Sequence, residues 1–528
     1  MTQPTSVPRP EYPRPQWVRP EWINLNGPWQ FEIDHGKSGK ESGYAEAGRE
    51  LSGTITVPFA PESKLSGVEY KDFMAAVWYR REVTLPESWQ GGRVLLHFGA
   101  VDYETEVWVN GVSVGKHRGG YSSFSFDMTS AATPGVNIIT VYAEDDVRSG
   151  RQPRGKQSER LYSHGCDYTR TTGIWQTVWL EHVPATYLSS MKLIADPDNA
   201  SAHLTVKLGG NPASQAKLAV TASYEGKPVG AAEIVVSGST AQLALPLSEV
   251  HLWEPGNARL YDLTLTLQVP GEAGDEVQSY FGLRTVRLDG MAFRINEKSV
   301  FQRLVLDQGF YPDGVYTAPT DDDLRRDIEL SMAMGFNGAR LHEKIFEPRF
   351  LYWADKLGYL VWGEHANWGL DITTAASIAH FLPEWMEAVE RDFNHPALIG
   401  WCPFNETWDR DGAKQDNDVL RIIYEETKRI DPTRPVIDTS GNFHVVTDIF
   451  DLHDYDQNPE TFRARYEPMK TGGEAFNTFP NRQQYGGQPY FIANMAGSGG
   501  IRSRRTTNRG GTATVRPPRK RSSRAMRA

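Results

Sequence analysis

The sequence has little cysteine and no long apolar run. Only two cysteines, Cys166 and Cys402, occur in 528 residues, so disulfides do not organise the fold, and their spacing does not suggest a zinc site. No apolar run approaches the ~20 residues that span a bilayer, and the proline-rich start has no apolar segment typical of a secretory signal. We therefore expect a soluble, cytoplasmic protein with no membrane partner and no structural metal.

Acidic residues are absent from the last part of the chain. All 66 Asp and Glu residues precede Ala493, together with 46 Lys and Arg, whereas ten Lys or Arg and no acid follow from Ala493 onward. An acidic body is a poor candidate for nucleic-acid binding through its main surface. The abrupt change of charge after Ile492 needs an explanation of its own.

The length predicts about three domains, and the first two are all-β. Residues 1–185 contain short strands of alternating polarity, and Asn110-Gly111 between two such runs predicts a two-residue hairpin turn. Residues 186–287 continue in the same style, at about the length of a seven-stranded immunoglobulin-like sandwich. We expect two consecutive β-sandwiches.

Strand-like runs alternate with helical ones in residues 288–492, which predicts βα units. Seven candidate strands occur there: 299–307, 335–342, 358–365, 397–406, 435–441, 448–455 and 488–492. Helical spacing is found between them at 320–335, 383–394 and 417–431, and Thr320 with the acids after it suits a helix N-terminus. A TIM (β/α)8 barrel is the economical interpretation, and it needs one more strand than the chain supplies.

A carboxylate follows the fourth predicted strand. In a (β/α)8 barrel, reactive side chains lie at the C-terminal ends of the strands, where Asn405 and Glu406 follow the apolar run ALIGWCPF. Aromatic neighbours such as Trp401 and Trp408 partly desolvate a carboxyl, which raises its pKa and lets it donate a proton. We expect Glu406 to be a general acid, although an Asn-Glu pair alone also fits an ordinary surface glutamate.

Four segments carry a specific resemblance to one family. They are RPEWINLNGPWQFEID (19–34), VPFAPESKLSG (57–67), YTRTTGIWQTVWLE (168–181) and NHPALIGWCPFNETW (394–408). These segments resemble the signatures of glycoside hydrolase family two, the β-galactosidase and β-glucuronidase family. The resemblance implies a sugar-binding jelly roll, an immunoglobulin-like domain and a catalytic (β/α)8 barrel, acting on a β-linked glycoside with retention. It also implies that Glu406 is the acid/base and that Asn405 contacts the 2-hydroxyl of the sugar.

Residues at other strand ends are candidates for contacts with the sugar. Through hydrogen bonds or stacking, a sugar-sized site could be lined by Arg340, His342, Trp362, Trp401, His453 and Tyr455. For each of them taken singly, a structural role is about as plausible. The family's magnesium-ligand pattern is not matched by GEHANWG (363–369), so we expect no metal and no cofactor, and galactose specificity is in doubt.

The resemblance also implies a nucleophilic Glu after the seventh strand, commonly within Ser-Glu-Tyr-Gly-Gly. Retaining glycosidases need this second carboxylate, and the chain has Ala493-Asn494-Met495-Ala496-Gly497 there instead. Codons for these residues, read from the third base of Ala493, permit Glu-Tyr-Gly-Gly. We therefore expect a barrel that is truncated or frameshifted at Ile492, a disordered tail over residues 493–528, no nucleophile, and little or no turnover.

Two other interpretations remain open. The basic end could be a genuine extension that binds nucleic acid or directs localisation, and the whole chain could be a noncatalytic carbohydrate-binding protein. The expected partner is a carbohydrate substrate, with no nucleic acid; homo-oligomerisation is left open.

Overall fold

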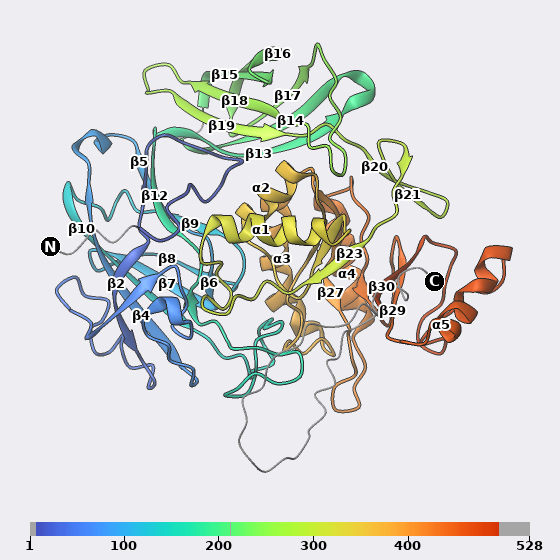
Figure 1. The fold of residues 1–528 in the computed structure, drawn as a ribbon. Coiled ribbons are helices and arrows are strands. Elements are labelled where there is room, and N and C mark those ends of the chain that lie inside the picture. Colours follow the sequence, from blue (N-terminus) through green and yellow to red (C-terminus); the bar gives the residue numbers. More distant parts are fainter. Residues whose placement is uncertain (1–6, 212, 496–528) are drawn as a thin grey trace.

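The computed structural model describes residues 7–211 and 213–495, which form two β-sandwiches and a barrel of parallel strands. Figure 1 shows the first sandwich in blue beside the barrel in yellow and orange, with the second sandwich in green across one end. The part of the predicted tail after Met495 lies outside the described residues. No helix in the described part of the chain is long and apolar enough to cross a membrane.

The first sandwich packs a six-stranded sheet against a four-stranded one. The six-stranded sheet has the order β3-β2-β4-β10-β7-β8 and the four-stranded sheet the order β1-β12-β5-β9, while β11 pairs with β6. The strands are β1 (Trp22–Asn24), β2 (Gly27–Ile33), β3 (Gly53–Val57), β4 (Ala76–Leu85), β5 (Arg93–Phe98), β6 (Val101–Asp102), β7 (Glu104–Val109), β8 (Val112–Arg118), β9 (Phe124–Asp127), β10 (Gly135–Glu144), β11 (Gly173–Ile174) and β12 (Val178–Val183). The predicted hairpin is confirmed, because Asn110 and Gly111 have φ of 51° and 82° between β7 and β8.

The second sandwich has seven strands in sheets of three and four. The sheet orders are β13-β14-β17 and β16-β15-β18-β19. The strands are β13 (Thr186–Asp196), β14 (Ser201–Gly210), β15 (Ala213–Tyr224), β16 (Lys227–Gly238), β17 (Thr240–Pro246), β18 (Tyr261–Gln268) and β19 (Asp275–Phe281). Alternate residues such as Leu204, Leu218 and Leu265 fill the space between the sheets, as the period-two pattern predicts.

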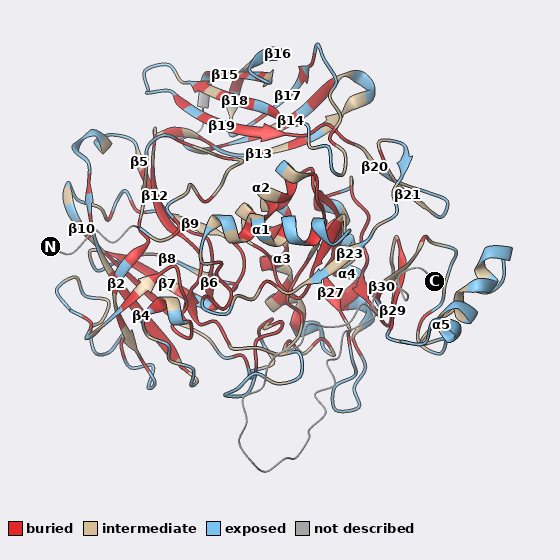
Figure 2. Ribbon diagram, viewed as in Figure 1, coloured by how far each residue is buried: buried red, intermediate tan, exposed pale blue. Residues whose placement is uncertain are grey.

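The barrel follows a small antiparallel sheet of β20 (Val286–Asp289), β21 (Ala292–Ile295) and β22 (Lys298–Ser299). Its parallel strands occur at all seven predicted places. They are β23 (Leu304–Asp307), β24 (Gly338–Leu341), β25 (Leu360–Glu364), β26 (Leu398–Cys402) with β27 (Phe404–Asn405), β28 (Thr439–Ser440), β29 (Phe450–Asp454) and β30 (Tyr490–Met495). The parallel pairings are β23-β24-β25-β26, β27-β28 and β29-β30. Within the described residues, no strand pairing joins β28 to β29 or β30 to β23. Figure 2 shows the buried residues of this region in red.

Five α-helices accompany the barrel strands. They are α1 (Asp321–Ala333), α2 (Pro348–Leu357), α3 (Ile378–Asp392), α4 (Asn417–Ile430) and α5 (Pro459–Tyr466). The predicted cap of α1 is confirmed, because Thr320 and Asp323 form a reciprocal capping box. Two helices, α2 and α5, were not predicted, and α3 begins before the predicted start at Pro383. Proline lacks the N–H that would pair with the Ala379 carbonyl, and Arg118 of the first sandwich donates to that carbonyl instead.

The predicted boundary at Ile492 is wrong. β30 continues through Ala493 and Asn494 to Met495, and its register with β29 places Asn494 opposite His453. The reason is that strand pairing depends on backbone hydrogen bonds, which the change in composition after Ile492 does not remove. Three residues assigned to the tail therefore belong to the barrel.

A loop of the first sandwich, residues 154–168, contacts the barrel near the C-terminal ends of its strands. The backbone N–H groups of Arg154 and Gly155 donate to the Trp368 carbonyl at 2.8 and 3.1 Å, and the Tyr168 hydroxyl donates to Gln308 at 2.7 Å. Gly155 has φ of 57°, and a Cβ there would lie 2.3 Å from the Glu343 carbonyl oxygen. Only glycine allows this close approach, so the loop is fixed against the barrel.

We predict that Gly155→Ala destabilises the protein more than Gly165→Ala. Both glycines lie in this loop with positive φ, at 57° and 55°, but a Cβ at Gly165 meets nothing within 4 Å. The backbone strain is therefore shared, and the collision with Glu343 adds about 1 kcal/mol or more in the first variant alone. Thermal unfolding of both variants measures the difference. Equal losses of stability would show that the loop does not depend on this contact.

Candidate active site

Glu406 lies directly after β27, at the C-terminal end of the fourth strand position. Its backbone N–H donates to the Ser440 carbonyl at 2.9 Å, and its φ is 49°, in the left-handed region. This turn aims the carboxylate across the mouth of the barrel, and 15% of its side chain remains exposed. The sequence placed Glu406 at this end of the strand, and it stands there accessible to a ligand.

Three side chains hydrogen-bond to the Glu406 carboxylate. His453 Nδ1 lies 2.7 Å and the Tyr455 hydroxyl 3.3 Å from Oε1, and the Trp408 indole donates to Oε2 at 3.4 Å. Burial raises the pKa of Glu406, but His453, Trp408 and the charge of Lys156 outweigh burial and bring the pKa to about 2. The prediction of a raised pKa is wrong, because hydrogen bonds to the charged form outweigh desolvation. Glu406 is thus ionised at neutral pH.

Arg340 on β24 connects the strands around this carboxylate. Its Nη2 lies 2.6 Å from Asn405 Oδ1 and 2.8 Å from His342 Nδ1, and its Nη1 lies 3.3 Å from His453 Nε2. It also donates to Ser440 and forms an ion pair with Glu364 on β25. The guanidinium therefore orients both residues of the Asn-Glu segment, Asn405 directly and Glu406 through His453.

His342 lies beside this guanidinium and is neutral. Burial, Arg340 and Lys156 all lower the pKa of His342 well below its usual range. Because Nδ1 accepts the hydrogen bond from Arg340, the proton lies on Nε2, where it can be donated to a sugar hydroxyl. Burial also raises the pKa of Glu364, and the charge of Arg340 offsets part of that rise.

The Asn405 amide has an unused donor. Its Oδ1 accepts from Arg340, whereas its buried Nδ2 has no hydrogen-bond partner among the described residues. The backbone of Asn405 is held on both sides by Asn367, whose Oδ1 accepts from the N–H at 2.6 Å and whose Nδ2 donates to the C=O at 3.1 Å. A buried N–H without a partner is costly, so this group is available for a ligand hydroxyl.

Sequence reasoning missed several residues of this site. Asn367 and Trp368 follow the third barrel strand, and this position after a strand end could have marked them as site residues in the sequence. The Trp368 indole donates to the Asn405 carbonyl at 3.1 Å. Lys156 has no signal in the barrel at all, because it comes from the first sandwich. The predicted residues Arg340, His342, His453 and Tyr455 are brought together around Glu406.

The two predicted tryptophans do not reach this site. Trp401 is buried, packs on Trp385 of α3 and donates to Asp431 after α4, because its side chain points outward from the strand toward the helices. Trp362 is 1% exposed and packs with Phe293 and Phe491 in the core. Their assignment as sugar contacts is corrected, and Trp408, 51% exposed beside Glu406, is an accessible tryptophan there instead.

A second layer of charges holds His453 in place. Ser440 lies 3.0 Å from His453 Nε2 and donates to Asp451 at 2.6 Å. Asp451 and Asp438 both contact the buried His444. Burial lowers the pKa of His444, but these two carboxylates outweigh burial and raise it to about 10. The positive imidazolium fixes the loop after β28 behind the site.

Strand β30 presents Asn494 opposite Glu406. The Asn494 amide donates to the Tyr455 hydroxyl at 3.1 Å, and that hydroxyl in turn donates to Glu406. The amide nitrogen and the carboxylate oxygen are therefore both within hydrogen-bond distance of the Tyr455 hydroxyl. The neutral Asn494 amide is thus linked to the Glu406 carboxylate through one hydroxyl group.

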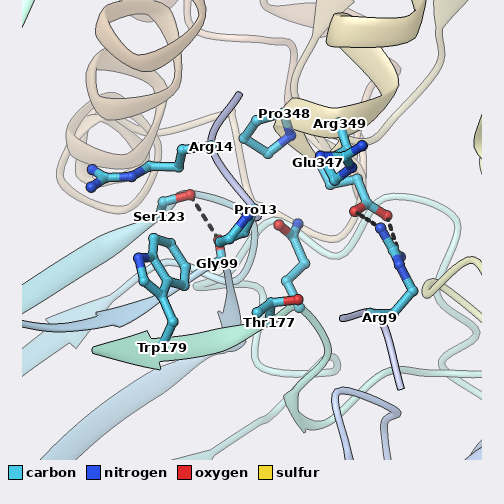
Figure 3. Close-up of a pocket in the computed structure, with 11 residues that line it drawn as sticks. Arg9, Pro13, Arg14, Gly99, Ser123, Thr177, Trp179, Glu347, Pro348 and Arg349 are labelled. Carbon is cyan, nitrogen blue, oxygen red and sulfur yellow. Dashed lines mark hydrogen bonds and ion pairs between the residues drawn. The ribbon is translucent and has the colours of Figure 1, made fainter. Parts of the chain in front are cut away.

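In residues 7–211 and 213–495, neither a cluster of metal-ligating side chains nor the cavity beside Arg9 points to another catalytic centre. Within the described residues, no group of three or more His, Cys, Asp or Glu side chains is arranged to hold a metal ion. The cavity in Figure 3 is about 10 Å³ and has room for about one water. It lies where Arg9 pairs with Glu347 at 2.7 Å, at a seam between the start of the chain, the first sandwich and α2.

An accessible carboxylate beside an orienting amide, at the carboxyl ends of barrel strands, is the arrangement expected of a glycosidase. Comparison with known families identifies the particular one. Residues 23–184 match "Glycosyl hydrolases family 2, sugar binding domain", residues 186–284 match "Glycosyl hydrolases family 2", and residues 316–484 match "Glycosyl hydrolases family 2, TIM barrel domain". The chain belongs to glycoside hydrolase family 2.

Several curated relatives and solved structures that it resembles are β-glucuronidases. The enzyme of Paenibacillus borealis is 24% identical over 450 residues, 78% of this chain and 72% of that protein. The enzyme of Rattus norvegicus is 27% identical over 455 residues, 78% of this chain and 67% of that protein. The crystal structure of Ruminococcus gnavus β-glucuronidase superposes with a TM-score of 0.75 at 20% identity, covering 93% of this chain and 85% of that one.

We predict that Arg340→Met strongly destabilises the barrel. The change leaves Glu364 buried without its ion pair, which typically costs about 3–5 kcal/mol. Arg325→Met is the matched control, because Arg325 forms its ion pairs on the exposed face of α1 and its loss should change stability by about 0.5 kcal/mol or less. Urea denaturation measures both. Similar losses for the two variants would contradict the central place of Arg340.

We predict that Glu406 makes stability depend on pH in the acid range. Its folded-state pKa is lowered, so its stabilising contribution is fully present above the usual carboxyl pKa of about 4.5 and is lost as the pH falls toward about 2. Urea denaturation of the native protein and Glu406→Gln at pH 6, 4 and 3 measures this. The difference in unfolding free energy between them should shrink as the pH falls, and a constant difference would contradict the low pKa.

Proposed function

We propose that this fold is built to hydrolyse β-linked glycosides of glucuronic acid with retention of configuration. The observation that carries the proposal is the ionisable Glu406, held by His453 and Tyr455 beside the unpartnered Asn405 amide. The names of the curated relatives support glucuronic acid as the sugar. Asn405 Nδ2 would bind the 2-hydroxyl, and Glu406 would be the acid/base.

In a retaining mechanism Glu406 has two tasks. It protonates the leaving oxygen while a carboxylate attacks the anomeric carbon, and it then removes a proton from the water that releases the sugar. The first task requires a protonated Glu406, and a second carboxylate about 5 Å away favours that form by repulsion. In this chain the neighbour is the neutral Asn494, and the pKa of Glu406 is about 2. Glu406 is therefore prepared to act as a base and not as an acid.

The position of Asn494 leads to the second part of the proposal, which is that this chain turns over its substrate slowly. An amide does not form the glycosyl-enzyme ester, so the covalent step has no nucleophile at this position. A change of reading frame after Ile492 would account for both the missing Glu and the basic residues that follow. Carbohydrate binding with little hydrolysis is the second candidate function, and the same observation favours it.

We predict that Asn494→Glu raises the hydrolysis of 4-nitrophenyl β-D-glucuronide by about two orders of magnitude or more. The new carboxylate would supply the nucleophile and raise the pKa of Glu406 by like-charge repulsion. Asn494→Gln is the matched control, since it has the length of Glu without the charge. Release of 4-nitrophenol from the glucuronide, glucoside and galactoside measures both rate and sugar preference.

The combined variant Asn494→Glu with Glu406→Gln separates the two roles, because it retains the nucleophile and lacks the acid/base. It should lose most of the gain. If the unaltered chain hydrolyses the glucuronide as fast as Asn494→Glu, slow turnover is refuted. If Asn494→Glu is no faster than Asn494→Gln on any of the three sugars, the proposed site of the nucleophile is wrong.

A further inference from the structure

Lys156 is a buried lysine beside the active site. Within the described residues, no oxygen accepts a hydrogen bond from its ammonium group. The residue is 3% exposed, and its ammonium lies 3.4 Å from the centre of the Trp368 ring and 3.4 Å from Cys166 Sγ. Among residues 7–211 and 213–495, no carboxylate lies within ion-pair distance of it and no oxygen accepts its hydrogen bond. Lysine is rarely buried in this way unless it is paired, because a desolvated ammonium is costly.

The backbone around Lys156 is fixed, so the ammonium does not reach this place by chance. Its carbonyl accepts from the Tyr168 N–H at 2.7 Å, and the two residues before it are bonded to the Trp368 carbonyl. The Trp368 indole donates in turn to the Asn405 carbonyl. One aromatic side chain thus touches both the lysine of the first sandwich and the residue next to Glu406.

The other basic groups of this region are already engaged. Arg340 is taken by Glu364 and Asn405, Arg154 pairs with Asp167 at 2.7 Å, and Lys344 donates to the carbonyls of Gly309 and Tyr316 at 2.6 and 2.9 Å. Within the described residues, the nearby Glu343 forms no ion pair with Lys156; burial raises the pKa of Glu343 well above its usual range, and the charge of Lys156 offsets part of that rise. Of these basic groups in the described part of the chain, Lys156 is the one whose hydrogen bonds reach no oxygen acceptor.

We propose that Lys156 binds the carboxylate of a hexuronic acid in the sugar subsite, and so selects uronides over neutral glycosides. The inference rests on the proposed function and assigns one recognition residue to it. A carboxylate supplies the acceptor oxygens that the ammonium lacks, and the Trp368 ring offers an apolar face beside them. The low pKa of Glu406, to which the charge of Lys156 contributes, places the ammonium within electrostatic reach of the reacting end.

The test is calorimetric titration of the full chain with two thioglycosides that are not hydrolysed. Phenyl 1-thio-β-D-glucuronide and phenyl 1-thio-β-D-glucoside share a neutral aglycone and differ in the carboxylate of the sugar. The native protein should bind the glucuronide about tenfold or more tightly, the weight of a charge-assisted hydrogen bond. Lys156→Met retains the apolar stem over Trp368 and should reduce this preference to about twofold or less, with the glucoside affinity unchanged.

Two further variants make the result specific. Lys156→Arg retains the charge and should keep most of the preference. Lys64→Met is the control, because it removes an exposed lysine, with a side chain 66% exposed, that pairs with Asp313. This variant should change the affinity for neither ligand. Thermal unfolding of each variant checks that it is folded.

The possible outcomes distinguish three claims: the role of Lys156, recognition of the carboxylate, and glycoside binding itself. If Lys156→Met weakens both ligands equally or leaves the preference intact, Lys156 has a structural role and the inference is refuted, while the proposed function stands. If the native protein binds both ligands with equal affinity, carboxylate recognition fails although glycoside binding holds. If it binds neither ligand, the proposed function itself fails and the inference falls with it.

Discussion

The active site depends on one buried guanidinium. Arg340 contacts side chains from four other strand positions of the barrel: Glu364, Asn405, Ser440 and His453. A planar group with five donors can satisfy that many partners at fixed angles, which a lysine ammonium cannot do. The direction of the Asn405 amide and the position of His453 against Glu406 both follow from it. The strands are the scaffold, and Arg340 sets the geometry of the chemistry.

Much of the fold was predictable, because its causes are local. Period-two alternation gave the sandwiches, and the Asn110-Gly111 turn and the Thr320 cap act within a few residues of themselves. The site was only partly predictable. Its position followed from strand ends, but the side on which a strand residue points did not, so Trp401 was assigned to the sugar and packs on the helices instead. Lys156 was beyond reach, because only folding brings it from the first sandwich to the barrel mouth.

Glu406 and Asn494, the two residues that contact the Tyr455 hydroxyl, differ in charge. Hydrogen bonds from His453 and Trp408 favour the charged form of Glu406. Among residues 7–211 and 213–495, no second carboxylate hydrogen-bonds to the Tyr455 hydroxyl beside Glu406, where the Asn494 amide donates instead. In a retaining glycosidase, two carboxylates about 5 Å apart would share that balance and keep one of them protonated. A site that has kept its acid/base, its orienting amide and its cations can still bind a sugar. Under the proposed function, what it lacks is the group that would form the covalent intermediate.

The most direct measurement is a mass determination of the intact protein after incubation with 2-deoxy-2-fluoro-β-D-glucuronyl fluoride. The carboxylate nucleophile of a retaining enzyme displaces fluoride from this reagent and becomes glycosylated, and the 2-fluoroglycosyl ester is then hydrolysed slowly. The account predicts no added mass on the native chain, and one added sugar on the strand-seven peptide when residue 494 is a glutamate. An adduct on any carboxylate of the native chain would contradict it, because the protein would then possess a nucleophile that Asn494 was held to replace.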